Sequence, residues 1–288
     1  MLLSASRCAV LLAHPGHELV IHGFVERSRP LVAVLTDGSG SSGHSRVDST
    51  TRVLESTGAE PSGFYGGFTD QRLYAALLGH DHDLFVSMAE ELAGVLVASR
   101  IQVVVGDASE GWNPIHDVWR SVVNAAVELA SHRLGADIRN FDFLLFGSHR
   151  AAAVDCSRQA VVLQLDEAAY ERKLAVGELY AELHAEVQAA LSGSTASIVR
   201  SPALSAELDR RLAGLNAEAY RTELLRPVGA TPAAAAEPRV YELYGEMMVA
   251  AGRYKEAIRY DRHLAPVEWA LRQHAARETG SRLVCASS

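Results

Sequence analysis

Short apolar runs alternate with amphipathic stretches along the first 165 residues of the chain. Most of the runs are apolar at consecutive positions, as in strands that are buried on both faces. We predict strands at residues 8–13, 31–36, 62–65, 102–106, 141–146 and 160–165. The stretches between them have helical spacing, and we predict helices at residues 17–26, 49–56, 71–78, 84–100 and 115–133. This alternation is typical of the α/β class, with a mostly parallel sheet and helices on both of its faces.

The pattern changes after residue 165. Residues 166–228 carry a helical pattern at 166–192, a linker at 193–201 and a second helical stretch at 205–215, so we predict a helical continuation packed on residues 1–165. Residues 229–238 (GATPAAAAEP) have low complexity and contain two prolines, which is typical of a flexible linker. Residues 239–288 return to ordinary composition and complete a mainly helical C-terminal extension.

Composition and charge exclude several classes of protein. The 288 residues include 27 Lys+Arg and 35 Asp+Glu, and the resulting net charge of −8 argues against a nucleic-acid partner. No apolar run approaches the roughly 20 residues that span a bilayer, so we expect no membrane association. The three cysteines, Cys8, Cys156 and Cys285, are too few and too scattered for a disulfide framework or a thiolate metal cluster.

The first residues and the residue usage indicate where the protein works. Residues 1–13 lack the basic start and the cleavage site of a secretory signal, so we interpret them as leading into a buried first strand and expect a cytoplasmic protein. Arginine outnumbers lysine 25 to 2, which is typical of a GC-rich bacterial genome. We expect a small molecule as the partner, and a homo-oligomer is compatible with the sequence.

Two histidines stand where the first predicted strand passes into the first predicted helix. In the motif HPGHE, His14 belongs to the strand end and His17 to the first helical turn, so the two imidazoles can converge on one ion. A catalytic zinc site needs three protein ligands and one open position. His116, in the motif NPIHD, follows the strand at 102–106 and is the candidate third ligand. Parallel sheets place their ligand sites at these carboxyl ends of strands.

The same motifs have a structural interpretation. Asn113 followed by Pro114 is a favourable helix start on local grounds alone. Glu18 and Asp117 suit first helical turns, where the helix dipole stabilises negative charge. One H-x-x-H spacing is weak evidence for a metal, and the pairing of two strand–helix junctions is what strengthens the hypothesis.

The segment AHPGHE resembles the AHPDDE signature of the LmbE-like, or GlcNAc-phosphatidylinositol de-N-acetylase (PIG-L), family of zinc-dependent N-deacetylases. The order of the other features is similar: LTDG at residues 35–38, Arg52 and Glu55 in the spacing R-x-x-E, and a P-x-H motif ending at His116. The resemblance covers roughly residues 7–150 and extends weakly into the tail. It implies a Rossmann-like fold and hydrolysis of an N-acyl group, usually on an amino sugar, by a metal-activated water.

The resemblance also implies which residues hold the metal. By position in the motifs the ligands are His14, His17 and His116, with His17 where the family has an aspartate. Three histidines form a legitimate zinc site, and iron, cobalt and nickel also accept imidazole ligands.

This chain departs from the family at its acid–base positions. The general base of the family is the first aspartate of HPDD, and Gly16 stands there. Asn113 replaces a histidine that stabilises the oxyanion, and Ile115 replaces the aspartate before the last ligand. Asn113 can still donate a hydrogen bond to an oxyanion. Losing a general base costs about 10²- to 10⁴-fold in rate.

Four carboxylates are candidates for the missing base. In order of preference they are Asp117, Glu18, Asp37 and Glu110. The first two directly follow proposed ligands, so capping or second-layer support of the ligands is the alternative role for each. A more acidic water on an ion held by three neutral imidazoles is the other alternative.

Three residues are candidates for substrate contact. Arg52 and Asp70 stand where the family presents groups to sugar hydroxyls, and Trp112 precedes Asn113 as a candidate apolar wall of the pocket. A surface salt bridge is the alternative for Arg52, and a helix cap is the alternative for Asp70.

The first functional hypothesis is therefore a metal-dependent hydrolase that cleaves an amide of a small polar, amino-sugar-like substrate. The second is a metal-dependent biosynthetic enzyme that uses the same scaffold for a reaction other than deacetylation. The third is a non-catalytic relative. Gly16 at the position of the base motivates both alternatives.

Overall fold

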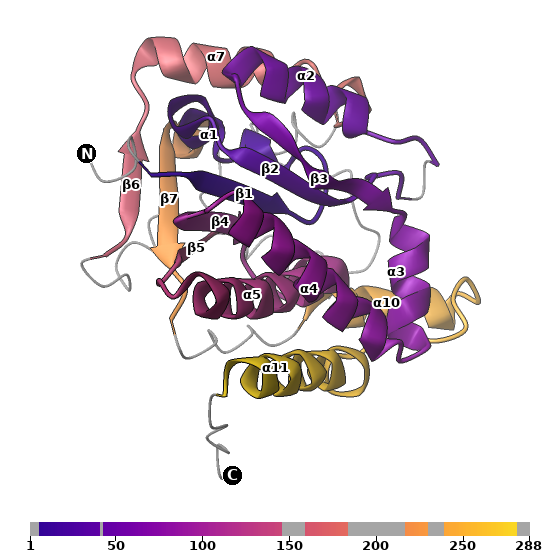
Figure 1. The fold of residues 1–288 in the computed structure, drawn as a ribbon. Coiled ribbons are helices and arrows are strands. Elements are labelled where there is room, and N and C mark those ends of the chain that lie inside the picture. Colours follow the sequence, from indigo (N-terminus) through magenta and orange to yellow (C-terminus); the bar gives the residue numbers. More distant parts are fainter. Residues whose placement is uncertain (1–5, 41–42, 146–158, 184–216, 230–238, 281–288) are drawn as a thin grey trace.

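The computed structural model of the chain describes residues 6–40, 43–145, 159–183, 217–229 and 239–280. One seven-stranded sheet forms the centre of this part of the chain (Figure 1). Its strands are β1 (Cys8–Leu12), β2 (Leu31–Thr36), β3 (Glu60–Phe68), β4 (Val103–Asp107), β5 (Arg139–Phe143), β6 (Val161–Gln164) and β7 (Thr222–Pro227).

The order of the strands places a topological switch point beside β1. The order across the sheet is β3-β2-β1-β4-β5-β7-β6. The strands from β3 to β5 are parallel, whereas β7 pairs antiparallel with both β5 and β6. The chain proceeds outward in one direction from β1 to β3 and in the other from β4 to β5. Open α/β sheets bind ligands outside the carboxyl ends of the strands at such a point.

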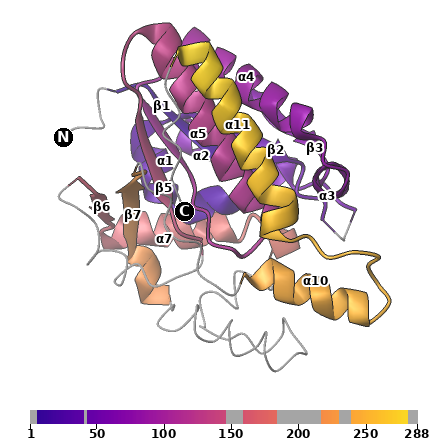
Figure 2. The ribbon, with the colours of Figure 1, turned by 90° about the horizontal axis from the view of Figure 1, so that it is seen from below.

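Helices cover both faces of the sheet (Figures 1 and 2). On one face α1 and α2 pack on the sheet and α7 contacts α1, while on the other face α4 and α5 lie between the sheet and α11. The α-helices are α1 (His22–Ser28), α2 (Val47–Thr57), α3 (Asp70–Leu78), α4 (His82–Ala98), α5 (Pro114–Leu134), α7 (Glu167–Gly177), α10 (Val240–Ala250) and α11 (Ala265–Thr279). The short helical turns are η1 (His17–Leu19), η2 (Ala181–Leu183), η3 (Ala217–Arg221) and the π-helical η4 (Tyr260–Leu264).

Successive residues of β1 supply two different cores. Ala9 and Leu11 pack toward α4 and α5, whereas Cys8, Val10 and Leu12 pack toward α1 and α2. All five residues of β1 are buried, because successive side chains of a strand point to opposite faces and both faces are covered. The α/β class and the mostly parallel sheet predicted from the pattern are therefore confirmed.

Several predicted boundaries change. The helix predicted at 17–26 is two elements, η1 and α1, because the chain turns at Val20 and Ile21. The helix predicted at 166–192 ends at Gly177, and residues 184–216, including the predicted linker at 193–201 and helix at 205–215, lie outside the described residues. The linker predicted at 229–238 also lies outside them from residue 230 onward.

Two strands differ from prediction in instructive ways. The sequence pattern missed β7, because only Leu224 and Leu225 stand together as an apolar pair and Glu223 beside them is charged yet buried. Residues 166–228 are therefore not a purely helical continuation, since they add a strand to the sheet. The strand predicted at 141–146 begins at Arg139, because polar residues can occupy a strand end that is partly exposed. Within the described residues, no helix is long and apolar enough to cross a membrane.

Candidate metal centre

His14, His17 and His116 converge at the carboxyl ends of β1 and β4. Their ring centroids lie 5.3 Å apart for His14 and His17, 4.8 Å for His14 and His116, and 4.7 Å for His17 and His116. One nitrogen from each ring lies within 4.8 Å of the other two, so the three can serve one ion. The structure thus brings together the three histidines that the motifs selected.

Local backbone structure explains this convergence. His14 follows β1, and the chain then turns sharply at Gly16, which has φ of 103°, a left-handed conformation that favours glycine. The turn places His17 at the start of η1, facing back toward His14. His116 lies in the first turn of α5, which begins at Pro114 after the N-cap residue Asn113. The cap predicted at Asn113 is therefore present, together with the histidine.

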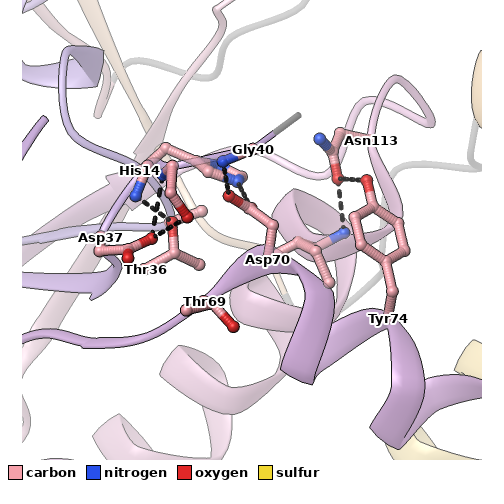
Figure 3. A network of polar contacts seen from close by, with 12 residues as sticks. His14, Thr36, Asp37, Gly40, Thr69, Asp70, Tyr74 and Asn113 are labelled. Atoms are coloured by element: carbon pink, nitrogen blue, oxygen red, sulfur yellow. Dashed lines mark hydrogen bonds and ion pairs between the residues drawn. The ribbon is translucent and has the colours of Figure 1, made fainter. Parts of the chain in front are cut away.

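A buried carboxylate orients His14. Asp70, the first residue of α3, lies 2.6 Å from His14 Nε2 through its Oδ1 atom. Its other oxygen accepts a hydrogen bond of 2.9 Å from the amide of Gly40 (Figure 3). Both oxygens of Asp70 are engaged, and Thr69 instead caps α3 by accepting a hydrogen bond from the amide of Arg72. Asp70 therefore orients His14 rather than capping its own helix.

A second carboxylate orients His17. Asp107 Oδ2, at the end of β4, lies 2.9 Å from His17 Nδ1 and accepts a hydrogen bond of 2.6 Å from the amide of Ala13. Metal-ligating histidines commonly use their second nitrogen in this way, because the carboxylate fixes the ring and its tautomer. The arrangement leaves His17 Nε2 and His14 Nδ1 as the atoms available to a metal.

The free atom of His14 fits this role. His14 Nδ1 is buried and has no hydrogen-bond partner in the described part of the chain. Burial lowers the pKa of His14, and burial with the nearby charges of His17, His14 and Arg46 holds the pKa of His116 well below its usual value. Neutral imidazoles are the form that binds a divalent ion. A buried, unpaired and neutral nitrogen beside two further imidazoles therefore fits a metal site.

Tyr74 on α3 fixes the side chain of Asn113. Asn113 Oδ1 accepts a 2.8 Å hydrogen bond from the amide of Ile115 and a 3.4 Å hydrogen bond from the hydroxyl of Tyr74 (Figure 3). Both hydrogen bonds use the side-chain oxygen of Asn113, so its amide nitrogen remains available as a donor. This nitrogen lies on the side away from Tyr74 in Figure 3. This is the polarity required of a donor to a developing oxyanion.

The space beside Gly16 is filled by a later part of the chain. A Cβ at this position would lie 2.5 Å from Leu183 Cδ1 and 3.8 Å from Tyr180 Cε1. The hydroxyl of Tyr180 bonds Glu18 and also lies 2.5 Å from Thr50 Oγ1. Tyr180 and Leu183 therefore pack against the HPGHE turn. We call these two residues the C-terminal clamp.

Three of the four predicted bases accept hydrogen bonds from backbone amides. Glu18 is fully buried and bonds the Gly16 amide and Tyr180, and burial raises its pKa. Asp117 accepts hydrogen bonds of 3.0 and 3.1 Å from the amides of Glu110 and Gly111, and burial raises its pKa to about 6. Glu110 accepts a 2.6 Å hydrogen bond from the amide of Leu145. The contacts of Glu18 and Asp117 match the supporting roles that the sequence left open for these two residues.

Asp37 is a half-buried carboxylate with one oxygen that no described residue occupies, whereas the unpartnered Oδ2 of Asp117 is fully buried. It directly follows β2, whose last residue Thr36 donates a 3.0 Å hydrogen bond to the carbonyl oxygen of Ala13. The side chain of Asp37 is therefore carried on the strand end next to His14. Its Oδ1 accepts hydrogen bonds of 2.9 and 2.7 Å from the amide and hydroxyl of Ser39. Oδ2 accepts none from the described residues and the side chain is half-buried.

The predicted substrate contacts lie in different surroundings. Arg52 is exposed on α2 and donates to Ser49 Oγ at 2.8 Å and to the carbonyl oxygen of Leu179 at 3.4 Å. Among the described residues it does not form the salt bridge that was the alternative. Trp112 is half-buried and packs against Val240 at the start of α10. It therefore joins the loop before α5 to the C-terminal extension.

Sequence reasoning missed several residues of this centre. Asp107, Tyr74, Tyr180 and Leu183 were not selected, and neither was Arg46 at the start of α2. Asp107 carried a usable signal, because it ends the apolar run VVVGD at the same edge of the sheet as His14. The others come from elements whose position relative to the histidines depends on tertiary packing.

The fold and the three buried or half-buried histidines define an α/β protein with a candidate divalent-metal centre at the topological switch point. The chain is similar to the solved structure of the zinc-inhibited form of teicoplanin deacetylase Orf2, with 15% identity, a TM-score of 0.49, and coverage of 78% of this chain and 100% of that chain. A triple mutant of a deacetylase involved in the teicoplanin biosynthetic pathway is similar at 14% identity, with a TM-score of 0.45 and the same coverage. No family model and no curated protein matches the sequence. At this level of similarity any chemistry is argued from the residues of this chain.

Proposed function

We propose that the chain is a zinc-dependent hydrolase of the LmbE-like type, which cleaves the N-acyl bond of a small polar substrate such as an amino sugar. The observation that carries the proposal is the convergence of His14, His17 and His116 within 4.8 Å, with carboxylates on the second nitrogens of two of them. Such a centre is built to hold a divalent ion with an open position. When bound, the ion supplies Lewis acidity for the carbonyl oxygen and a more acidic water.

Two residues of the chain complete the chemistry. Asn113 donates from its amide nitrogen toward the carbonyl oxygen as negative charge develops there, and Tyr74 holds its other end in place. Asp37 accepts a proton at Oδ2, the oxygen that no described residue occupies. Asp37 thereby takes the role that Gly16 cannot perform, from the neighbouring strand end.

The proposal is tested first by metal content. Full-length protein should contain about one transition-metal ion per chain by elemental analysis, and His14→Ala should lose it because two imidazoles bind far more weakly than three. His132→Ala, an exposed histidine of α5, is the matched control and should keep the metal. Absence of metal from the wild-type protein, or retention by His14→Ala, would contradict the proposal.

Activity is tested by acetate release from a panel of N-acetylated sugars. We expect metal-dependent turnover with at least one of them, which chelation should abolish. A flat response across the panel, with metal present, would contradict deacetylation and leave the second candidate function.

The second candidate is a metal-dependent biosynthetic enzyme that catalyses another reaction on the same scaffold, and the third is a non-catalytic relative. The C-terminal clamp favours these two candidates, because Leu183 fills the space that a side chain acting as general base at position 16 would enter. In either case we propose a small-molecule partner and a cytoplasmic setting, and the excess of arginine over lysine supports a bacterial source.

A further inference from the structure

The side chain of Glu18 closes the HPGHE turn on itself. The amide of Gly16 donates a 2.9 Å hydrogen bond to Glu18 Oε2, beside the left-handed bend that separates His14 from His17. The Glu18 side chain is fully buried. Its carboxylate therefore braces the part of the turn that sets the positions of the two imidazoles.

Two buried hydroxyls connect this carboxylate to α2. The hydroxyl of Tyr180 donates to Glu18 Oε1, the oxygen that Gly16 does not use, and it lies 2.5 Å from Thr50 Oγ1. Tyr180 and Thr50 are as fully buried as Glu18. Both oxygens of Glu18 are thereby engaged, one by the turn itself and the other by the C-terminal clamp.

Further contacts with α2 hold the segment that carries Tyr180. Ser49 Oγ donates a 2.8 Å hydrogen bond to Glu182 Oε1, and Arg52 donates to the carbonyl oxygen of Leu179 at 3.4 Å. Both contacts lie beside the one that Tyr180 makes with the same helix. Three neighbouring contacts therefore fix the hydroxyl of Tyr180 relative to α2.

Packing alone does not account for this arrangement. Leu183 already fills the space beside Gly16 with an apolar side chain. The ring of Tyr180 could pack there without its hydroxyl, and burying a polar group costs free energy that only well-formed hydrogen bonds recover. Buried polar networks in which every group is paired make a site rigid and specify one geometry. The hydroxyl of Tyr180 is therefore suited to fixing the geometry of the turn.

We propose that Tyr180 is a positioning residue of the metal centre. It acts through Glu18 and holds the HPGHE turn in the geometry in which His14 and His17 can meet one ion. Residues that orient metal ligands from outside the coordination sphere change metal affinity by about 10- to 100-fold when they are replaced. The inference rests on the proposed function in requiring a bound ion, and it holds whichever reaction that ion serves.

The first test measures the affinity of the full-length protein for Zn²⁺ by competition with a chelator. Tyr180→Phe keeps the ring and removes the hydroxyl, so it should weaken binding at least about tenfold. Thr50→Val removes the other end of the same hydrogen-bonded chain and should also weaken binding. Tyr170→Phe is the matched control, because the hydroxyl that it removes from α7 bonds the carbonyl oxygen of Ala217 instead, and it should leave the affinity unchanged.

The second test separates positioning from stability. The visible absorption of bound Co²⁺ reports its coordination geometry. At saturating Co²⁺ the spectrum should change in Tyr180→Phe and stay as in wild type in Tyr170→Phe, although both variants lose a tyrosine hydrogen bond. Glu18→Gln keeps an oxygen that can accept from the Gly16 amide, so it should retain more Zn²⁺ affinity than Glu18→Ala.

The outcomes distinguish this inference from the proposed function. Equal Zn²⁺ affinity and equal Co²⁺ spectra in wild type and Tyr180→Phe would overturn the inference and leave the deacetylase standing. An equal loss of affinity in Tyr170→Phe would also overturn it. Weaker Zn²⁺ binding in Tyr180→Phe alone, without acetate release by the wild type, would sustain the positioning role and contradict the deacetylase. A wild-type protein that binds no metal would contradict both.

Discussion

Gly16 shows how one residue can redirect a whole site. At the position where the resembled family has its base, the backbone is left-handed and the adjoining volume belongs to Leu183. The space that a carboxylate at this position would use is filled by an apolar side chain from 167 residues further along the chain. Restoring the acid therefore requires two changes.

We expect Gly16→Asp alone to destabilise the protein by about 1–3 kcal/mol, because the new side chain meets Leu183 and the backbone is left-handed. It should add no activity. Gly16→Asp with Leu183→Ala should recover part of the stability and accept the carboxylate beside the histidines. Thermal unfolding and acetate release of both variants check this, and a single variant as stable as the wild type would contradict it.

Asp37 is the residue on which proton transfer should depend. Asp37→Asn should lower turnover by about 10²- to 10⁴-fold with unchanged metal content, because the amide keeps the contacts to Ser39 but cannot accept a proton. Steady-state kinetics and elemental analysis measure the two effects. Asp48→Asn, an exposed acid on α2, is the control, and a small effect of Asp37→Asn would exclude it as the base.

The convergence of His14, His17 and His116 could be predicted from the sequence because each follows an apolar run, and parallel strands bring such positions to one edge. The supporting residues could not. Tyr180 and Leu183 approach from a segment whose pattern predicted a continuous helix, and Tyr74 and Arg46 depend on how α3 and α2 pack. The residue types at strand ends can be taken directly from the sequence. Contacts between residues of different elements depend on tertiary packing, which the local pattern does not predict.

At the scale of elements, α1 is anchored by a residue from the other end of the fold. Both oxygens of Glu223 on β7 accept 2.8 Å hydrogen bonds from the amides of Gly23 and Phe24. Lys173 on α7 lies 2.8 Å from Glu223 Oε1 and donates to the carbonyl oxygen of Val20. The apolar pattern missed β7 because Glu223 is charged. The same buried carboxylate caps the N-terminus of α1.

His22, the first residue of α1, lies in these surroundings and gives a pH prediction. It is 1% exposed and neither ring nitrogen has a hydrogen-bond partner among the described residues. Burial lowers its pKa, and the charges of Lys173 and Arg172 add to this while those of Glu223 and Glu26 oppose it. Below its ordinary pKa of 6.5 the unfolded chain therefore binds a proton that the folded chain does not.

The free energy of unfolding should consequently fall as the pH is lowered through 6.5, by at most about 1.4 kcal/mol per pH unit from this one group. His22→Leu should reduce that slope between pH 5 and 6.5, as measured by urea unfolding. His132→Leu, in an exposed position on α5, should leave it unchanged. An identical slope in His22→Leu and wild type would contradict the assignment.

At the scale of the whole molecule, the metal centre joins the two halves of the sheet. His14 and His17 follow β1, and His116 follows β4 on the other side of the switch point. An ion bound to all three connects the end of the first strand to the start of α5. Binding should therefore stabilise the fold as a unit.

Chelation should lower the melting temperature. At a free metal concentration about 100 times the dissociation constant, binding contributes about 2.7 kcal/mol, which corresponds to roughly 5–10 °C for a protein of this size. Scanning calorimetry with and without chelator measures the shift. His14→Ala should show none, and an equal shift in that variant would place the stabilising metal elsewhere.

The position of β7 between β5 and β6 has a consequence for synthesis on the ribosome. β6 is made first, and in the described structure its strand partner is β7, which follows about 60 residues later. At roughly 5–20 residues per second, β6 waits several seconds for that partner. All three ligand histidines also precede Tyr180 and Leu183 in the chain. The nascent protein thus presents the HPGHE turn before Tyr180 and Leu183, which pack on it, have been made, so the proposed metal can bind before that packing forms.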